Sequence, residues 1–206
     1  MKDTHITTLF LDIGGVLLTN GWGRVERNNA VAHFQLNSDE VQERHHLTFD
    51  TYEQGKLSLD EYLKRVIFYE PRNFSTDDFI AFMLKQSTAY QTTIDFFKSL
   101  KVKYDLNVIA VNNEGRELNE FRIKEFHLGE LFDGFVSSAF VHLRKPDADL
   151  FRMAIDVSQA SPAASLYIDD RHMFVEVAQT LGMNGIHYTG LDAVKAELKS
   201  YGLEVN

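Results

Sequence analysis

From residue 92 onward the sequence alternates helical segments with short apolar segments, and this alternation constrains the fold more than any other feature. Strands separated by helices in this way are typical of a parallel sheet with helices on both of its faces. A first strand is expected at residues 6–11. The other expected strands are 106–111, 134–137, 165–168 and 185–188, and the helices are 92–101, 116–126, 147–157, 174–181 and 191–200. The sequence therefore predicts an α/β protein built on a parallel sheet.

The stretch between the first strand and the next is too long for a single crossover helix and has a helical pattern of its own. Four helices are expected in it, at 24–34, 38–54, 58–69 and 75–85. Three of them begin with a hydroxyl N-cap followed by acids, at Ser38, Ser58 and Ser75. A glycine-rich hinge precedes the first of these helices. We therefore expect a sheet core formed by residues 1–18 and 88–206, with a small helical bundle inserted at 19–87.

Composition excludes several classes of protein. A chain of 206 residues that is 44% hydrophobic can bury a sizeable core, and the absence of cysteine excludes disulfides, thiolate nucleophiles and sulfur-ligated zinc. No secretion signal or membrane-length apolar run is found, so a cytoplasmic protein is expected. The net charge of -9 argues against nucleic acid as a partner. Small molecules are the expected partners, and the protein could be a monomer or a homodimer.

The first expected strand ends in a carboxylate, Asp12, which is followed at once by Gly14 and Gly15. Open α/β sheets bind their ligands at the carboxyl ends of their strands, and glycines there let backbone approach a ligand closely. Asp12 is therefore a candidate nucleophile or metal ligand. A simple turn after a strand, which Asp-x-Gly sequences often form, is the alternative for this motif taken alone.

Polar residues also follow three other expected strands, at 112–113, 137–138 and 169–170. Because the strands are parallel, these groups should converge with Asp12 at one edge of the sheet. Three neighbouring carboxylates, Asp12 and the two at 169–170, repel one another unless a cation lies among them, and an all-oxygen site suits Mg²⁺. Lys145, just before a helix, can balance both these acids and an anionic substrate.

In this order and spacing, Asp12-x-Gly14-Gly15, Asn112-Asn113, Lys145-Pro146 and Asp169-Asp170 resemble the four motifs of the haloacid dehalogenase superfamily of hydrolases. The resemblance covers nearly the whole chain from Thr8 to about Tyr188. It implies a Rossmann-like sheet core, a mobile helical cap between the first two motifs, and phosphoryl transfer through an aspartyl-phosphate in most members.

Carried over by position, the resemblance makes Asp12 the nucleophile and Lys145 the group that orients it and neutralises the phosphoryl oxygens. Asp12, the carbonyl of Gly14 and Asp170 would hold Mg²⁺, with Asp169 as a further or water-mediated ligand. The motifs thus predict Mg²⁺ as the cofactor.

Further residues are candidates for binding the substrate. Asn112 would touch the phosphoryl oxygens, with Asn113 and the glycines at 14–15 beside it. Trp22, just after the hinge, could hold the leaving group or could simply pack against the helical bundle. Of the other polar candidates, His142 and Arg144 could add positive potential beside Lys145, and the pair 45–46 is expected on a solvated helix face.

Two positions depart from the pattern of the phosphatases in this superfamily. Gly14 stands where they usually have a second aspartate that acts as general acid and base. General acid-base catalysis contributes about two to four powers of ten, so a phosphatase without it should be slow, limited to good leaving groups, or reliant on water or on a residue of the cap. Asn112 replaces the usual Ser or Thr, but an amide still donates a hydrogen bond.

The sequence leaves three functions open. The first is a Mg²⁺-dependent phosphatase that acts on a small phosphorylated metabolite. The second is a 2-haloacid dehalogenase, which needs no acid at position 14 but also no metal, so that the pair Asp169-Asp170 would be without purpose. The third is a catalytically silent member that binds a phosphorylated ligand or a protein.

Overall fold

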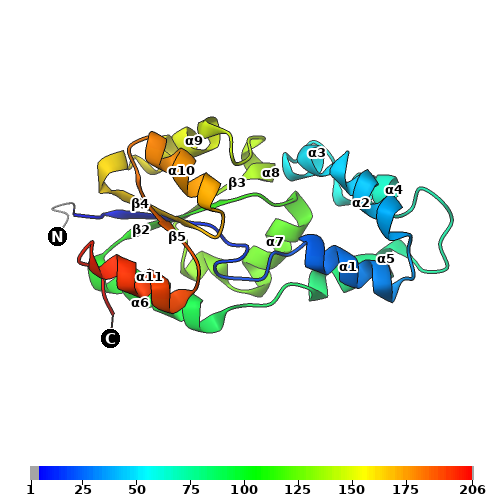
Figure 1. The fold of residues 1–206 in the computed structure, drawn as a ribbon, viewed down its shortest axis with the longest axis horizontal. Coiled ribbons are helices and arrows are strands. Elements are labelled where there is room, and N and C mark those ends of the chain that lie inside the picture. Colours follow the sequence, from blue (N-terminus) through cyan, green and yellow to red (C-terminus); the bar gives the residue numbers. More distant parts are fainter. Residues whose placement is uncertain (1–4, 206) are drawn as a thin grey trace.

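The computed structural model describes residues 5–205 and shows a five-stranded, fully parallel sheet with helices on both faces (Figure 1). The strand order is β3-β2-β1-β4-β5, so the first strand lies at the centre. The strands are β1 Thr8–Leu11, β2 Asn107–Asn112, β3 Gly134–Ser137, β4 Ser165–Asp169 and β5 Asn184–His187. The predicted α/β class with a Rossmann-like parallel sheet is confirmed.

Eleven α-helices and two short 3-10 helices, Leu128–Glu130 and Pro162–Ala164, are found among the described residues. The helices between β1 and β2 are α1 Arg24–His33, α2 Ser38–His46, α3 Phe49–Glu53, α4 Leu59–Val66, α5 Thr76–Lys85 and α6 Gln91–Tyr104. The later helices are α7 Arg116–Glu125, α8 Ser138–Val141, α9 Ala148–Ser158, α10 His172–Thr180 and α11 Leu191–Lys199. None of the described helices has the length and apolar character needed to cross a membrane.

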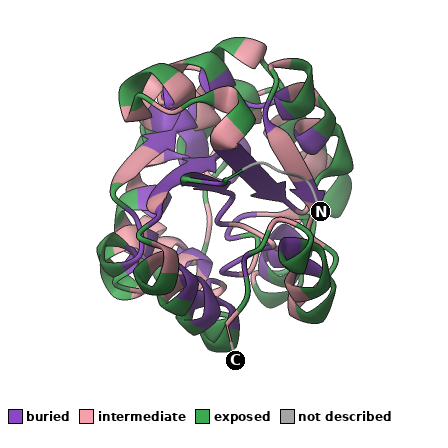
Figure 2. Cartoon of the chain, turned by 90° about the vertical axis from the view of Figure 1, so that its left-hand side faces the viewer, coloured by how far each residue is buried: buried purple, intermediate pink, exposed green. Residues whose placement is uncertain are grey.

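The alternation of side chains along β1 explains why the sheet needs two layers of helices. Leu9 and Leu11 face one side of the sheet, where they join a hydrophobic core with α6 and α11, and Phe10 faces the other side, toward α9 and α10. All three side chains are fully buried. Figure 2 shows the same layering, with buried strands between helices whose outer faces are exposed. A strand buried on both faces reads as a continuous apolar run, as this one does.

Helices α1 to α5 form a separate layer beyond the sheet, the helical insertion (residues 19–87), seen at the right of Figure 1. It has a hydrophobic core of its own, which includes Tyr62, Phe79 and Met83 and is completed by Leu118 from α7. The insertion therefore packs its apolar side against a helix of the sheet layer.

The two segments that connect the insertion to the sheet layer pair with each other in one antiparallel bridge. Leu18 and Ala89 form an isolated β-bridge, and the backbone N–H of Thr19 donates to the Thr88 carbonyl at 3.0 Å. These contacts lie at the boundaries expected from the sequence, 18/19 and 87/88. The division into two domains stays a prediction, because the structure shows one arrangement of the two parts.

Local sequence explains most helix boundaries, with two corrections. Ser58 and Glu61 form the expected capping box at the start of α4. The helix expected at 38–54 is wrong as a single element, because it breaks at Leu47 into α2 and α3. Asn37 rather than Ser38 caps α2, with its side-chain oxygen accepting from the backbone N–H of Glu40 at 3.1 Å.

Candidate active site

Asp12 lies directly beyond the end of β1, which pairs with β2 on one side and β4 on the other. Its backbone N–H donates to the Ile168 carbonyl at 3.0 Å, which holds it to the end of β4. Its Oδ1 accepts from the backbone N–H of Ile13 at 2.8 Å, and the residue is 7% exposed. The central position of β1 thus places this carboxylate between the ends of two neighbouring strands.

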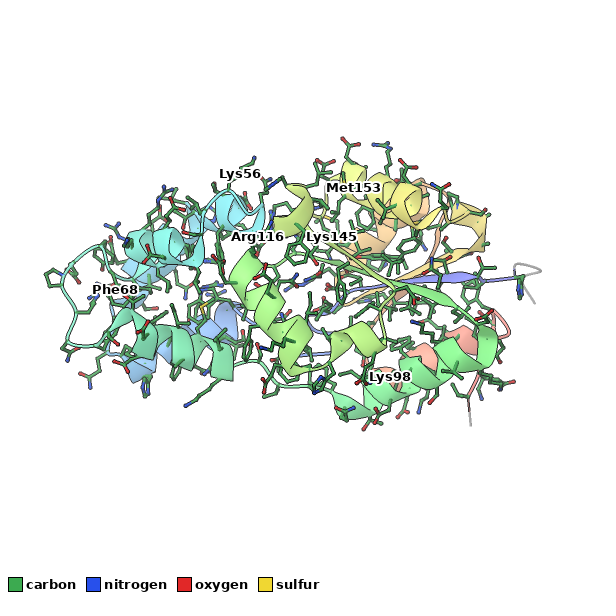
Figure 3. All side chains as sticks on the ribbon, turned by 180° about the vertical axis from the view of Figure 1, so that it is seen from behind. Lys56, Phe68, Lys98, Arg116, Lys145 and Met153 are labelled. Atoms are coloured by element: carbon green, nitrogen blue, oxygen red, sulfur yellow. The ribbon has the colours of Figure 1, made fainter. Side chains whose placement is uncertain are left out.

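Lys145 reaches this position from the loop before α9 and is 1% exposed. Its Nζ lies 3.0 Å from Asp12 Oδ1 and 2.7 Å from Asp169 Oδ2, and it donates to the Val111 carbonyl at 2.9 Å. In Figure 3 Lys145 lies near the junction of the sheet layer with the helical insertion. The structure therefore brings Lys145 between the two carboxylates that the sequence placed at separate strand ends.

Asn113 holds the backbone of Lys145 from both sides. Its Oδ1 accepts from the backbone N–H of Lys145 at 2.8 Å, and its Nδ2 donates to the carbonyl of the same residue at 2.9 Å. Asn113 also lines the cleft that contains Asp12. Its hydrogen bonds give it a second task, because they fix the start of the Lys145 side chain.

Asp169 is fully buried, and both of its oxygens have protein partners. Oδ2 accepts from Lys145 and from the Tyr167 hydroxyl, and Oδ1 accepts from the backbone N–H of Arg171 at 2.7 Å. Its structural task is therefore to hold Lys145 in place. Tyr167 is a site residue that the sequence-based prediction missed. The available signal was its position two residues before Asp169 on a strand, which puts both side chains on the same face.

The electrostatics of the site follow from burial and crowding. Burial, followed by the repulsion from Asp169 and Asp170, outweighs the attraction of Lys145 and raises the pKa of Asp12 to about 7. Burial and Asp169 likewise raise the pKa of Asp170. Burial alone would lower the pKa of Lys145, but the carboxylates of Asp12 and Asp169 outweigh it and raise that pKa. The Lys145 ammonium is therefore charged, but its single positive charge does not balance the carboxylates of Asp12, Asp169 and Asp170.

A divalent cation fits this deficit. Asp12, Asp169 and Asp170 each offer a carboxylate oxygen, and these oxygens lie within 4.8 Å of one another. When all three carboxylates are ionised, the Lys145 ammonium leaves two negative charges uncompensated in a mostly buried cluster. Arg171 offers little compensation, because its side chain is 63% exposed and stands 3.7 Å from Asp170. Carboxylate oxygens at this spacing are the donor set that Mg²⁺ prefers.

Gly15 is the residue that lets Asp170 approach the site. Its φ is +77°, and a Cβ added there would lie 2.3 Å from Asp170 Oδ2. We expect Gly15→Ala to cost about 1–3 kcal/mol of folding free energy through backbone strain. Displacement of Asp170 should also weaken Mg²⁺ binding by about 10- to 100-fold, as disturbance of a ligand's support does. Denaturant unfolding and calorimetric Mg²⁺ titration measure the two effects.

Gly14→Ala is the matched control for this prediction. Gly14 has no positive φ, and a Cβ there would meet only the side-chain oxygen of Asn20 at 3.3 Å and backbone atoms at 3.6 Å or more. Its unfolding free energy and Mg²⁺ affinity should stay close to those of the wild type. Equal losses in the two alanine variants would contradict the role given to Gly15.

Asn20 occupies the space beside Gly14 and lines the same cleft. An aspartate side chain, which the related phosphatases usually carry at position 14, would have to displace the Asn20 amide. Asn20 was not predicted as a site residue, since a polar residue within a glycine-rich hinge carries no signal of its own.

Asn112 is oriented differently from the expectation. Its Nδ2 donates to Asn119 Oδ1 at 3.0 Å, and its Oδ1 accepts from the Ser137 hydroxyl at 2.7 Å. Its side chain is not among those that line the cleft. The predicted contact between Asn112 and a phosphoryl group therefore stays a prediction.

The cleft between the sheet edge and the helical insertion has a volume of about 820 Å³ and contains Asp12, Gly14, Lys145 and Asp170. Trp22 lines it but is only 7% exposed, with its Nε1 donating to the Tyr62 hydroxyl at 2.9 Å and its ring edge-on to Phe79. The two alternatives for Trp22 therefore hold together: it packs in the core of the insertion and presents one edge to the cleft.

Three other expectations need correction. Arg144 does not supply unpaired positive charge, because it forms ion pairs with Asp50 at 2.5 Å and Glu53 at 2.7 Å from α3. The imidazole of His142 is bound to the Gln54 carbonyl at 2.7 Å, so both residues tie the insertion to the sheet layer. Of the pair 45–46, His46 is exposed as expected, but His45 contacts the Tyr62 hydroxyl at 2.7 Å and lines the cleft.

Comparison with known proteins agrees with this geometry. A family model described as haloacid dehalogenase-like hydrolase matches residues 6–182. The chain therefore belongs to the haloacid dehalogenase-like hydrolase family, and it is a hydrolase of that class. The resemblance of its motifs to this superfamily is thereby confirmed.

Individual relatives add detail. The sesquiterpene phosphatase AstK of Aspergillus oryzae is 34% identical over 79 residues, which are 38% of this chain and 40% of that protein, so the alignment spans about two fifths of the relative. A family enzyme of Bacteroides thetaiotaomicron, BT-2542, has the same fold, with a TM-score of 0.78 at 21% identity over 91% of this chain and 96% of that one. The L-2-haloacid dehalogenase of Xanthobacter autotrophicus gives a TM-score of 0.63 at 13% identity, over 97% and 85% of the two chains.

Proposed function

We propose that the protein is a Mg²⁺-dependent phosphatase that acts on a small phosphorylated metabolite, with Asp12 as the nucleophile. The observation that carries the proposal is the convergence of Asp12, Lys145 and Asp170 at one edge of the sheet, in a cleft large enough for such a substrate. The BT-2542 enzyme, which shares the fold, was crystallised with magnesium and inorganic phosphate, and the partial relative AstK is named a phosphatase.

Each charged side chain has a task in this reaction. Asp12 presents a carboxylate oxygen to phosphorus, and Lys145 holds that carboxylate through its 3.0 Å contact while its charge favours the incoming phosphate. Asp12 and Asp170 would hold the Mg²⁺, together with the Gly14 carbonyl, and Asp169 would contribute through water because its oxygens already have partners. Bound Mg²⁺ supplies the positive charge that stabilises the phosphoryl oxygens in the transition state.

The glycine at position 14 sets the expected rate. A leaving alkoxide needs a proton, and Gly14 cannot supply one. The enzyme should therefore favour leaving groups that depart without protonation, unless another residue of the cleft takes this task.

Metal dependence tests the proposal. With p-nitrophenyl phosphate as substrate, we expect hydrolysis in the presence of Mg²⁺ and a loss of about two or more powers of ten after its removal by EDTA, because the transition-state charge is then uncompensated. Asp170→Asn should require higher Mg²⁺ concentrations for the same rate. Hydrolysis that is equal with Mg²⁺ and with EDTA would contradict the proposal.

The two rival functions give different results in the same assays. A dehalogenase would release halide from a 2-haloacid without added metal. A silent member would bind Mg²⁺ and the phosphate analogue BeF₃⁻ but would hydrolyse no substrate from a broad phosphate panel.

A further inference from the structure

The helical insertion carries one carboxylate into the cleft that the proposed function leaves without a task, that of Glu26. It lies in the first turn of α1, is 9% exposed, and lines the same cleft as Asp12 and Lys145. Among residues 5–205 no side chain or backbone group forms a hydrogen bond or ion pair with this carboxylate. Neither of its oxygens is sealed off from solvent. Glu26 is therefore a nearly buried acid that is open to the cleft and has no hydrogen-bond or ion-pair partner, with only a longer-range attraction to the neighbouring Arg27.

The other two glutamates that line the cleft are held by cations. Glu53 accepts from Arg144 at 2.7 Å, and Glu114 accepts from Arg122 at 2.8 Å. Such pairs hold both carboxylates in fixed positions, although burial outweighs the attraction of the arginines and raises the pKa of Glu53, and that of Glu114 to about 7. Neither is placed to give up a proton and take it back without breaking an ion pair. Glu26 has no such constraint.

Glu26 lies on the side of the cleft that leads, through Asn20, to Gly14, where the related phosphatases usually have an acid. Glu26 Oε2 lies 2.7 Å from the point where a Cβ on Gly23 would be, and the Cβ of Asn20 lies 3.0 Å from the same point. The carboxylate of Glu26 is thus a neighbour of Asn20, whose side-chain oxygen lies 3.3 Å from where a Cβ on Gly14 would be. Asn20 therefore lies between Glu26 and position 14, and all three residues line the same cleft.

We propose that Glu26 is the general acid and base of the reaction, in place of the missing aspartate at position 14. This inference rests on the proposed phosphatase function and deepens it. In the first step an oxygen of Asp12 bonds to phosphorus, the bond from phosphorus to the leaving oxygen breaks, and the Glu26 carboxyl gives its proton to that oxygen. An alcohol leaves, and Glu26 becomes a carboxylate.

In the second step the Glu26 carboxylate takes a proton from water, whose oxygen bonds to phosphorus as the bond from phosphorus to Asp12 breaks. Inorganic phosphate leaves, and both side chains return to their starting forms. A structural role at the helix terminus is the alternative, and it predicts no dependence on the leaving group.

The substitution Glu26→Gln separates these two roles, since it keeps the size and polarity of the side chain and removes the proton. The readout is kcat/KM, which reports the first step, for n-butyl phosphate and for p-nitrophenyl phosphate. Butanol needs a proton to leave and p-nitrophenolate does not. We expect kcat/KM for butyl phosphate to fall by about 100- to 10,000-fold, far more than for the nitrophenyl ester. Glu43→Gln, on the exposed side of α2, is the matched control.

Restoring an acid at position 14 completes the test. Gly14→Asp combined with Glu26→Gln should recover much of the rate with butyl phosphate, because the backbone at Gly14 accepts a side chain if the Asn20 amide moves. Equal falls with both substrates, or no fall with either, would overturn the role of Glu26 and leave the phosphatase proposal standing. Wild-type protein that hydrolyses neither ester with Mg²⁺ present would overturn the phosphatase proposal itself.

Discussion

Asp12→Asn is expected to lower phosphate ester hydrolysis by about three or more powers of ten, the size of effect found when a nucleophile is removed. An amide cannot form the covalent bond to phosphorus, whereas it can keep the hydrogen bond that Asp12 accepts from the Ile13 N–H. Initial rates with p-nitrophenyl phosphate at saturating Mg²⁺ measure the loss.

The stability of the same variant shows whether the loss is chemical or structural. The pKa of Asp12 is raised from 3.8 to about 7 in the fold by burial and by neighbouring acids. The folded metal-free protein therefore holds this proton more tightly than the unfolded chain, and stability falls as pH rises through that window. An amide at position 12 carries no charge, so the variant should unfold at a higher temperature than wild type at pH 8, without metal. A rate close to that of wild type would remove Asp12 from the mechanism.

Lys145→Met is expected to reduce both stability and activity. Removal of one partner from a buried ion pair leaves the charge of the other uncompensated, at a cost of about 3–5 kcal/mol. Here two carboxylates, Asp12 and Asp169, lose the ammonium that lies 3.0 and 2.7 Å from them. The rate should also fall by about 100- to 1,000-fold through lost transition-state stabilisation.

The cost in stability should depend on pH. At pH 5 Asp12 takes up a proton, because its pKa already lies near 7 with the lysine present and rises further without it. The unfolding free energy lost in Lys145→Met should therefore be smaller at pH 5 than at pH 8. Lys124→Met, which removes an exposed lysine of α7, is the control and should be close to wild type at both. Equal stability of the Lys145 variant and wild type at pH 8 would contradict the proposed balance of charges.

Strand-helix periodicity predicted the fold because it reports local geometry that the tertiary structure leaves unchanged. β1 reads as a buried strand because both of its faces are covered, and the parallel pairing then brings Asp12, Asn113 and Asp169 to one edge. The convergence of acids with Lys145 could be inferred for the same reason, since strand direction alone places those residues at the same end of the sheet.

Side-chain directions could not be predicted in this way. Asn112 and Asn113 are adjacent in sequence, yet the first turns inward to Asn119 and Ser137 and the second turns to Lys145. The pairing of Arg144 with α3 depends on how the helical insertion docks, which no local pattern records.

Two further features of the insertion could not be predicted from the sequence. The break between α2 and α3 has no glycine or proline to mark it, and the Thr48 hydroxyl binds the Arg44 carbonyl there. Glu26 looks like an ordinary acid in the first turn of a helix, where such residues are common. Only its burial beside the hinge distinguishes it.

The central claim is that Asp12 carries the phosphoryl group during turnover, and acid quenching tests it most directly. Enzyme mixed with p-nitrophenyl phosphate and Mg²⁺, quenched in acid and digested, should yield the peptide that contains Asp12 with the added mass of one phosphoryl group. The modification should be absent without Mg²⁺ and in Asp12→Asn. Turnover that leaves this peptide unmodified at every quench time, or that places the phosphoryl group on another residue, would contradict the account.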